Sequence, residues 1–203
     1  MGDILSQLSS QFAGQSWAEI VAVAFALGYV WLAAKESIWC WPCALISTAI
    51  YTWLFWEVAL PFHTVLNAYY LVMALYGWSK WRKQGEKDIA VQTWAIKHHV
   101  VWIAGLTLVS IIMTQIGAMW LDTEYLYLDA FVTVFSVFTT VLVAHKVLEN
   151  WLYWLVINSF AMYLYFAKDM PLTGLLFVGY TVFAVYGYLK WRQQLTGRVC
   201  AQA

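Results

Sequence analysis

Two cysteines three residues apart are the feature of this sequence that most directly suggests chemistry. Cys40 and Cys43 enclose a tryptophan and a proline in the stretch IWCWPCALIS. In a soluble protein, a Cys-x-x-Cys pair around proline is typical of a redox dithiol. A membrane thiol oxidoreductase needs an oxidising compartment or a quinone, and usually a second cysteine pair to pass its electrons onward. The third cysteine of the chain, Cys200, stands alone. This enzyme is one hypothesis for the function.

A tryptophan pair followed by an asparagine suggests binding rather than catalysis. Trp151, Trp154 and Asn158 stand at positions i, i+3 and i+7, so they share one face of a helix. Two indoles offer flat faces for an aromatic or cationic ring, and a carboxamide inside a membrane must satisfy two donors and an acceptor. We interpret the three residues as a binding site. The alternative is an interfacial tryptophan belt with an interhelical amide bond.

A polar stripe lies on the apolar segment before this one. Asp129, Thr133, Ser136 and Thr140 are spaced 4, 3 and 4 residues apart, so they also share a helix face. Each hydroxyl can bond to its own helix backbone. A stripe headed by a carboxylate nevertheless predicts a wetted path into the protein, because polar groups inside a membrane are costly unless they are paired or face a cavity.

Polar residues recur at a similar depth in the first part of the chain. Ser47 and Thr48 fall near the middle of one expected helix, and Asn67 and Tyr70 share a face of the next. A buried amide is a good candidate for a ligand contact, whereas Tyr70 also fits plain packing. The candidate substrate-binding residues are Trp151, Trp154, Asn158, Ser47, Thr48, Asn67, Ser136 and Thr140, and the candidate pathway or gate residues are Glu19, Asp129, Trp41 and Tyr70.

The sequence holds no arrangement typical of covalent chemistry. Its four histidines, at positions 63, 98, 99 and 145, fall at the ends of apolar segments without metal-ligand spacing. There is no Ser-His-Asp set, no glycine loop for a phosphate and no pair of carboxylates at one depth. We therefore expect no enzyme activity, no metal site and no cofactor.

The composition indicates that membrane helices position these residues. Hydrophobic residues make up 63% of the 203 residues and charged residues only 11%, against about 25% charged in a soluble domain. A helix of roughly 20 apolar residues spans the hydrocarbon core. The net charge of zero argues against a nucleic-acid partner. We expect one all-α membrane domain over 1–203, with seven spans at 17–35, 38–57, 62–81, 98–117, 126–146, 149–167 and 171–191.

The distribution of lysine and arginine predicts the orientation. With these spans, ten of the 11 Lys and Arg residues fall on the face that holds the C-terminus, and Lys168 alone falls on the other. The positive-inside rule then places the N-terminus outside and the C-terminus in the cytoplasm. Cys40 and Cys43 lie at the cytoplasmic end, where disulfides rarely persist, and Pro42 fits the first turn of a helix. The orientation disfavours the redox hypothesis.

An internal repeat organises the chain. The stretch YGWSKWRKQ at 76–84 recurs as YGYLKWRQQ at 186–194, an offset of 110 residues. This offset equals four of the expected spans. Because four is even, equivalent helices of the two halves cross the membrane in the same direction. Parallel repeats of this kind place a substrate site between the halves, near the midplane. We expect a first bundle over 17–83, a linker helix over 98–117 and a second bundle over 126–194; a purely structural duplication is the alternative. The offset pairs Glu19 with Asp129, Trp41 with Trp151, Thr48 with Asn158, Pro61 with Pro171 and Tyr70 with Tyr180.

With these motifs in view, the sequence from Ser16 to about Arg192 resembles the PnuC family of vitamin transporters. The resemblance implies a 3+1+3 arrangement of seven helices, similar to that of the SWEET sugar transporters. It also implies facilitated diffusion of a B vitamin, which cytoplasmic phosphorylation then traps. The motifs that carry it are WxxWxxxN at Trp151, Trp154 and Asn158 after Glu149–Asn150, SWxE at Ser16, Trp17 and Glu19, and the helix end with Tyr76, Gly77, Trp78 and Trp81.

Two departures from the family pattern bear on the substrate. Typical nicotinamide riboside members have asparagine where this chain has Ser47, and glutamine where it has Asn67. A site built to hydrogen-bond its substrate loses affinity when a partner is missing, and the short chain looks like the thiamine-type members. The resemblance thus favours thiamine, with nicotinamide riboside or riboflavin as alternatives. It implies as partners a cationic aromatic vitamin, the lipid bilayer and a cytoplasmic vitamin kinase, and it leaves a homo-oligomer open.

Overall fold

The computed structural model describes residues 17–57, 61–83, 90–120, 125–167 and 171–202. In these ranges the chain is all-helical, as the composition predicts. The side chains of His63, Lys168 and Cys200, and all of Ser16, lie outside the described residues. The helices are α2 (Trp17–Ala34), α3 (Cys40–Glu57), α4 (Pro61–Lys83), α5 (Ile96–Gly117), α6 (Leu126–Ala144), α7 (Asn150–Ala167) and α8 (Pro171–Gln202).

The helix ends fall within two residues of the expected spans, with one exception. α8 continues from the expected end at 191 to Gln202. The expected end was placed where the apolar run stops, but a helix continues through polar residues when no proline interrupts it, and none follows residue 191.

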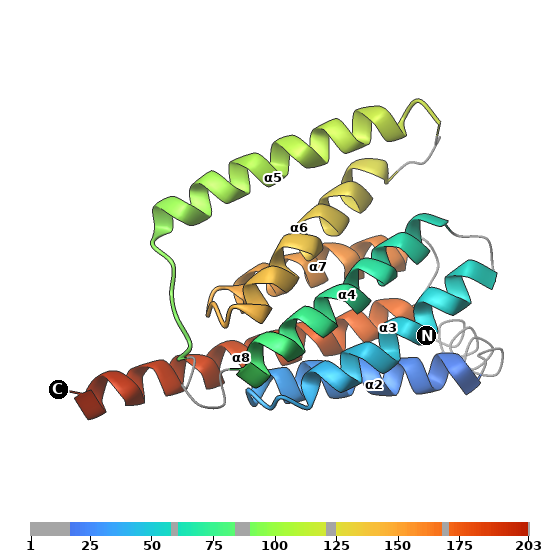
Figure 1. Ribbon diagram of the computed structural model, residues 1–203. Coiled ribbons are helices and arrows are strands. Elements are labelled where there is room, and N and C mark those ends of the chain that lie inside the picture. Colours follow the sequence, from blue (N-terminus) through green and yellow to red (C-terminus); the bar gives the residue numbers. More distant parts are fainter. Residues whose placement is uncertain (1–16, 58–60, 84–89, 121–124, 168–170, 203) are drawn as a thin grey trace, which may run out of the picture.

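Six of the helices close into a ring, and α5 stands outside it (Figure 1). In order around the ring, α2 packs on α3, α3 on α4, α4 on α6, α6 on α7, α7 on α8, and α8 returns to α2. α5 packs along α6 and extends away from the other helices (Figure 1). The interior of the ring is therefore bounded by every described helix except α5.

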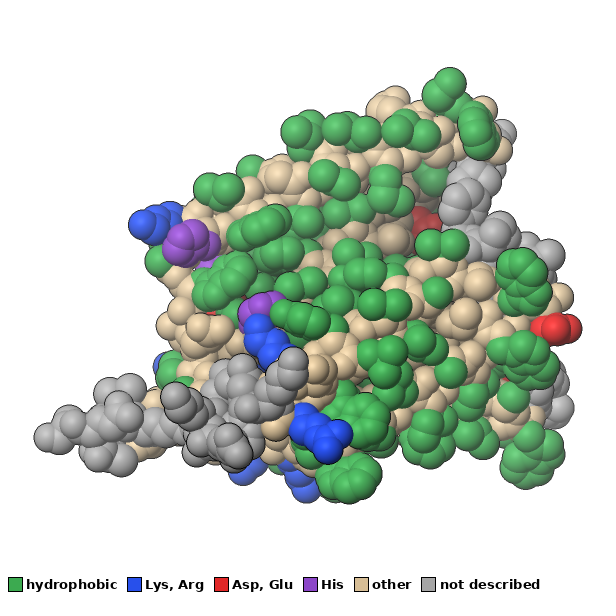
Figure 2. All heavy atoms as spheres, viewed as in Figure 1, with side chains coloured by type: hydrophobic (Ala, Val, Ile, Leu, Met, Phe, Trp, Pro, Cys, Tyr) green, Lys and Arg blue, Asp and Glu red, His purple; other side chains and the backbone are tan. Residues whose placement is uncertain are grey.

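The outer surface of the protein is apolar. Figure 2 shows hydrophobic side chains over most of the visible face, with Lys and Arg side chains gathered toward one end. By length and composition, three of the described helices, α2, α5 and α6, could each cross a membrane, and α3 holds a shorter apolar stretch, Cys40–Leu54. α4, α7 and α8 are less hydropathic because they carry tryptophans, tyrosines and amides, and because the C-terminal parts of α4 and α8 also carry lysines and arginines.

The same aromatic packing occurs twice, at positions 110 residues apart. The rings of Trp41 and Trp81 meet edge to face, with centroids 5.3 Å apart and planes at 88°. Those of Trp151 and Trp191 meet at 5.4 Å and 87°. Such pairs are worth about 0.5–1.5 kcal/mol beyond the area that they bury. The first pair fixes α3 against α4, and the second fixes α7 against α8.

A glycine lies against one tryptophan of each pair. A Cβ atom on Gly77 would overlap the indole of Trp41, and one on Gly187 would lie 2.6 Å from that of Trp151. We predict that Gly187→Ala lowers the free energy of unfolding by about 1–3 kcal/mol, because it overpacks this contact. Gly179→Ala on the same helix is the control, since nothing lies within 4 Å of its Cβ position. Thermal unfolding in detergent compares the two; a Gly187→Ala midpoint as high as that of Gly179→Ala would contradict the prediction.

Three contacts, which we call the end contacts, join the two halves at one end of the ring. The indole N–H of Trp81 donates to the Ala144 carbonyl at 3.1 Å, and that of Trp191 donates to the Ala33 carbonyl at 3.1 Å. The third is an ion pair between Glu36, in the turn before α3, and Lys146, in the turn before α7. Each of the three connects a residue of α2, α4 or their turns to one of α6, α8 or theirs.

The ion pair joins equivalent positions of the repeat. Glu36 and Lys146 are 110 residues apart, and both have left-handed backbones, with φ of 55° and 52°. The Lys146 Nζ lies 2.7 Å from the Glu36 carboxylate, and the lysine and glutamate side chains are 13% and 9% exposed. Lys146 also lies 4.7 Å from the ring centroid of Trp81. The pair is thus both buried and embedded in the aromatic packing.

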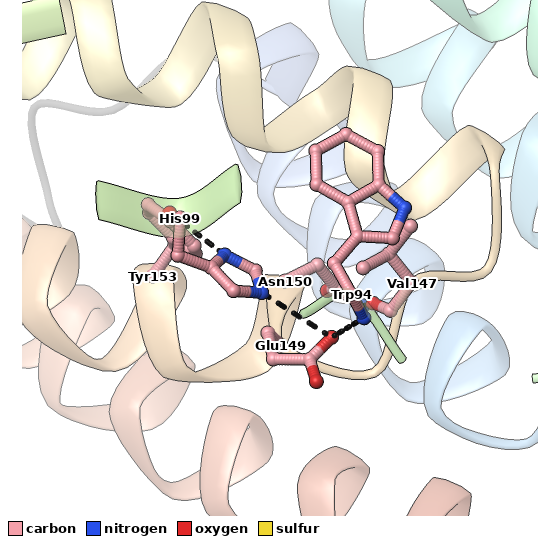
Figure 3. A network of polar contacts seen from close by, with 6 residues as sticks. All are labelled: Trp94, His99, Val147, Glu149, Asn150 and Tyr153. Carbon is pink, nitrogen blue, oxygen red and sulfur yellow. Dashed lines mark hydrogen bonds and ion pairs between the residues drawn. The ribbon is translucent and has the colours of Figure 1, made fainter. Parts of the chain in front are cut away.

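A polar network holds the segment before α5 against the start of α7 (Figure 3). The carboxylate of Glu149 accepts a hydrogen bond from the backbone N–H of Trp94 at 3.3 Å, and His99 Nε2 lies 3.8 Å from the same oxygen. His99 Nδ1 is 3.1 Å from the Tyr153 hydroxyl. The backbone of Gln92 bonds to the turn that precedes α7. These contacts position the first turn of α7, which carries the tryptophan pair.

Candidate functional site

The interior of the helix ring holds a cavity of about 370 Å³. Its described lining residues come from α2, α3, α4, α6, α7 and α8. Small-molecule sites typically have volumes of about 300–1,000 Å³. The lining combines aromatic rings, hydroxyls and amides with small apolar residues. It suits a compact ligand that has both a flat ring and polar groups.

The structure brings nearly all the candidate residues of the sequence analysis to this cavity. Thr133 of the polar stripe lines it as well. Glu19 is the exception: it lies outside the lining, and interacts electrostatically with the lining residue Tyr51. Both halves of the chain contribute to one volume. The candidates that line it are Trp41, Ser47, Thr48, Asn67, Tyr70, Asp129, Ser136, Thr140, Trp151, Trp154 and Asn158.

Asn158 is a buried lining residue whose amide can bond to a ligand. The residue is only 4% exposed, and the structure shows no hydrogen bond from its amide to another described residue. The amide is not among the fully enclosed polar atoms without a partner, so it faces the cavity. A ligand that bonds to such a group gains about 1–3 kcal/mol. Trp154, one turn away on the same face of α7, is half-buried and also lines the cavity.

Trp151 is placed differently from Trp154. It is 3% exposed, and its ring packs on Trp191 and against Gly187. Its Nε1 is buried without a hydrogen-bond partner, as is that of Trp41, its equivalent in the first half. Both rings therefore serve mainly as packed walls of the cavity, whereas Trp154 is only half-buried and lines the cavity. Sequence spacing alone does not separate the two tryptophans of α7.

The hydroxyls of the lining are largely engaged with backbone carbonyls. Thr48 donates to a carbonyl one turn earlier at 2.7 Å, and Thr140 does the same at 2.9 Å. Ser47 donates across to the Ala22 carbonyl of α2 at 2.9 Å. These protons are used, so the three oxygens can only accept a bond from a ligand. The expectation that Ser47 selects the substrate loses support, because its hydroxyl proton bonds to α2.

An aromatic group in the same cavity was missed by the sequence analysis. Tyr51, Tyr165, Phe177 and Tyr180 all line it. The rings of Tyr165 and Phe177 stack at 5.2 Å and 17°, and those of Phe177 and Tyr180 meet edge to face at 5.6 Å. One signal was available: Tyr165 follows Asn158 by seven residues, so it lies on the same face of α7.

The charge of the lining comes from one residue. Asp129, in the first turn of α6, is the only Asp, Glu, Lys, Arg or His among the described lining residues. The lining therefore offers no basic side chain to hold a phosphate. Cys40 and Cys43 are free thiols outside the lining. The described residues hold no group of three His, Cys, Asp or Glu that could bind a metal.

A closed ring of helices with an apolar exterior and a polar, aromatic cavity defines a membrane transporter for a small solute. The sequence model of the family described as "Nicotinamide mononucleotide transporter" matches residues 16–193, and the chain belongs to this family. The resemblance to PnuC proteins that the motifs indicated is confirmed. The chain is a vitamin transporter of the PnuC type and not an enzyme, and the oxidoreductase hypothesis is wrong.

Relatives and a solved structure agree with this assignment. The chain is 23% identical over 203 residues to "Nicotinamide riboside transporter PnuC" of Escherichia coli (strain K12), covering 87% of this chain and 85% of that protein. It is 23% identical over 183 residues to "Riboflavin/roseoflavin transporter RibM" of Streptomyces davaonensis, covering 86% and 84%. The crystal structure of the vitamin B3 transporter PnuC has a similar fold, with a TM-score of 0.70 and 24% identity over 95% of this chain and 90% of that one.

Proposed function

We propose that this protein carries a vitamin with a cationic aromatic ring across the bacterial inner membrane by facilitated diffusion. Nicotinamide riboside is the favoured substrate, because the named relatives include nicotinamide riboside transporters. The observation that carries the proposal is a buried amide without a partner, Asn158, beside the ring of Trp154 in a cavity of about 370 Å³. Trp154 would stack on the pyridinium ring, and Asn158 would bond to the carboxamide.

Thiamine is the second candidate. The resemblance favoured it on two grounds: the short chain looks like the thiamine-type members, and Ser47 and Asn67 replace the asparagine and glutamine of typical nicotinamide riboside members. Asn67 lines the cavity and supports a difference in the polar contacts. Ser47 supports it less, since its hydroxyl proton bonds to α2. The names of the relatives give nicotinamide riboside and riboflavin, so we rank thiamine below nicotinamide riboside and riboflavin third.

The lack of a basic group in the described lining supports a trapping step. A phosphorylated vitamin would bring two negative charges toward Asp129 with no described lysine or arginine to offset them. The unphosphorylated vitamin would pass, and its phosphate ester would not return. A cytoplasmic vitamin kinase would then make uptake effectively one-way without an ion gradient.

We further propose that the two halves rock against each other around the cavity. Seven spans would give a first bundle over 17–83, the linker α5 and a second bundle over 126–194, related as parallel repeats in a SWEET-like 3+1+3 arrangement. The matched tryptophan pairs support this relation. The N-terminus would lie outside and the C-terminus in the cytoplasm, so the end contacts would close the cytoplasmic end of the cavity.

Titration of the purified protein tests the substrate. We expect calorimetry to give the tightest binding for nicotinamide riboside, weaker binding for thiamine and riboflavin, and none for nicotinamide mononucleotide. Tighter binding of thiamine would reverse the ranking, and binding of none of these compounds would refute the proposed function. Uptake into liposomes should need neither a proton nor a sodium gradient; stimulation by either gradient would contradict facilitated diffusion.

The cysteines provide a negative prediction. Because Cys40 and Cys43 lie outside the cavity and carry no disulfide, the double variant Cys40→Ala/Cys43→Ala should transport the vitamin within about twofold of the wild-type rate. Liposome uptake per folded protein measures this, with the elution volume in detergent as the control for folding. A loss of uptake in a folded double variant would return a functional role to the Cys-x-x-Cys motif.

A further inference from the structure

Asp129 has no evident structural partner. It lines the cavity in the first turn of α6. Within the described residues its carboxylate has no hydrogen bond and no ion pair, and its one interaction is electrostatic, with the lining residue Tyr165. A carboxylate in a first turn does gain from the helix dipole. That gain explains its position along α6 but not its place in the cavity wall.

The position of Asp129 along the depth of the cavity can be found from α6 and α7, the two helices that carry the polar groups. Asp129 precedes Ser136 on α6 by seven residues, and Tyr165 follows Asn158 on α7 by seven, which is about 10 Å of helix in each case. Asp129 and Tyr165 interact with each other, so these four residues form two levels. The carboxylate lies about 10 Å from the level of the unpartnered amide, at the end of the cavity opposite the end contacts.

A unit charge at this distance has a measurable effect on binding. A ring stacked on Trp154, which precedes Tyr165 by 11 residues on α7, lies between about 10 and 16 Å from the carboxylate. At an effective dielectric constant of about 20, the Coulomb attraction over this range changes an equilibrium constant by roughly fivefold to fifteenfold. No described lysine, arginine or histidine in the lining offsets it. Glu19 occupies the equivalent position of the first half and interacts with Tyr51, which adds to the negative potential at this end.

We propose that Asp129 determines the charge specificity of the transporter, by serving as the counter-charge for a positively charged ring. The site then prefers a vitamin with a quaternary ring nitrogen over a neutral molecule of the same shape. This inference rests on the proposed function and adds to it one specificity-determining residue and the chemical class that it selects.

The test compares one molecule in two charge states. Nicotinamide riboside carries a pyridinium ring, and its 1,4-dihydro form has nearly the same shape with a neutral ring. We expect Asp129→Asn, which removes the charge and keeps the size, to weaken binding of nicotinamide riboside about tenfold and to leave binding of the dihydro form within twofold. Their affinity ratio should therefore fall about tenfold.

Two controls separate this role from a structural one. Glu57→Gln removes an exposed charge from the last residue of α3 and should leave the affinity ratio unchanged. Asp129→Glu keeps the charge and should keep the affinity ratio within about twofold of the wild-type value. Asp129→Ser is a second neutral variant that should lower the ratio by the same factor as Asp129→Asn, so the test stands even where Asp129→Asn does not fold.

The outcomes distinguish the two proposals. If both compounds bind the wild-type protein but their ratio is unchanged in folded Asp129→Asn or Asp129→Ser, the inference on Asp129 is overturned and the proposed function stands. If neither compound binds the wild-type protein, the proposed function is overturned together with this inference.

Discussion

Asn158→Ala lowers the affinity for the transported vitamin by about tenfold to a hundredfold and leaves the protein folded. The residue is 4% exposed and its amide has no partner in the described chain. Removing it therefore breaks no internal hydrogen bond, and the loss falls on the bound ligand, at about 1–3 kcal/mol for bonds to a buried group. Calorimetric titration of the vitamin into the purified variant measures the change.

The neighbouring residue supplies a matched control. Ser159 is exposed, and its hydroxyl donates to the Leu155 carbonyl of its own helix at 2.8 Å, so Ser159→Ala should bind as the wild type does. Trp154→Ala should weaken binding by a similar factor to Asn158→Ala, because it removes an aromatic ring from the cavity lining. Wild-type affinity in both Asn158→Ala and Trp154→Ala would move the site away from this face of α7.

Periodic patterns predicted the helices and the face of α7 that meets the cavity. Trp154 and Asn158 share one face at any plausible crossing angle, because the spacing fixes their directions relative to the helix axis. The repeat likewise paired Trp41 with Trp151 as equivalent positions, and the two make matching edge-to-face contacts with Trp81 and Trp191. Such features depend on local geometry or on symmetry within the chain, and both can be inferred from one sequence.

The remaining features depend on contacts between distant segments. The bond of Ser47 to Ala22 joins α3 to α2, and no spacing within either helix indicates it. The role of Trp151 as a packed wall depends on Gly187, which lies 36 residues further along the chain. The stacked rings of Tyr165 and Phe177 come from two helices, so only half of that pair could have been predicted from α7.

If the two halves rock as proposed, we expect the ion pair between Glu36 and Lys146 to hold them in a closed state. A buried pair adds little net stability, because desolvation of both charges offsets their attraction. Removing only one of the two charges costs about 3–5 kcal/mol, because the remaining charge stays buried without a partner. Reversing one charge places two like charges together, so it should separate the two halves at this end and not merely weaken their contact. Alternating access needs such a contact, one that either forms fully or breaks.

Cys40 can report on this closed state. It is 0% exposed, begins α3 and lies close enough to Lys146 for an electrostatic interaction. In a background with Cys43→Ala and Cys200→Ala, Cys40 is the only thiol that a maleimide can label. We predict slow labelling with the pair intact, and labelling at least tenfold faster in Glu36→Lys or in Lys146→Glu.

The exchanged pair is the decisive variant. Glu36→Lys/Lys146→Glu restores opposite charges at the same two backbone positions, so Cys40 labelling should slow again and vitamin uptake should recover. Recovery should be partial, because the lysine at position 36 loses the contact with the ring of Trp81 that Lys146 makes, worth about 0.5–2 kcal/mol. If the exchanged pair labels as fast as either single reversal, attraction between these charges does not close the cavity, and the two tryptophan hydrogen bonds would have to hold that end alone.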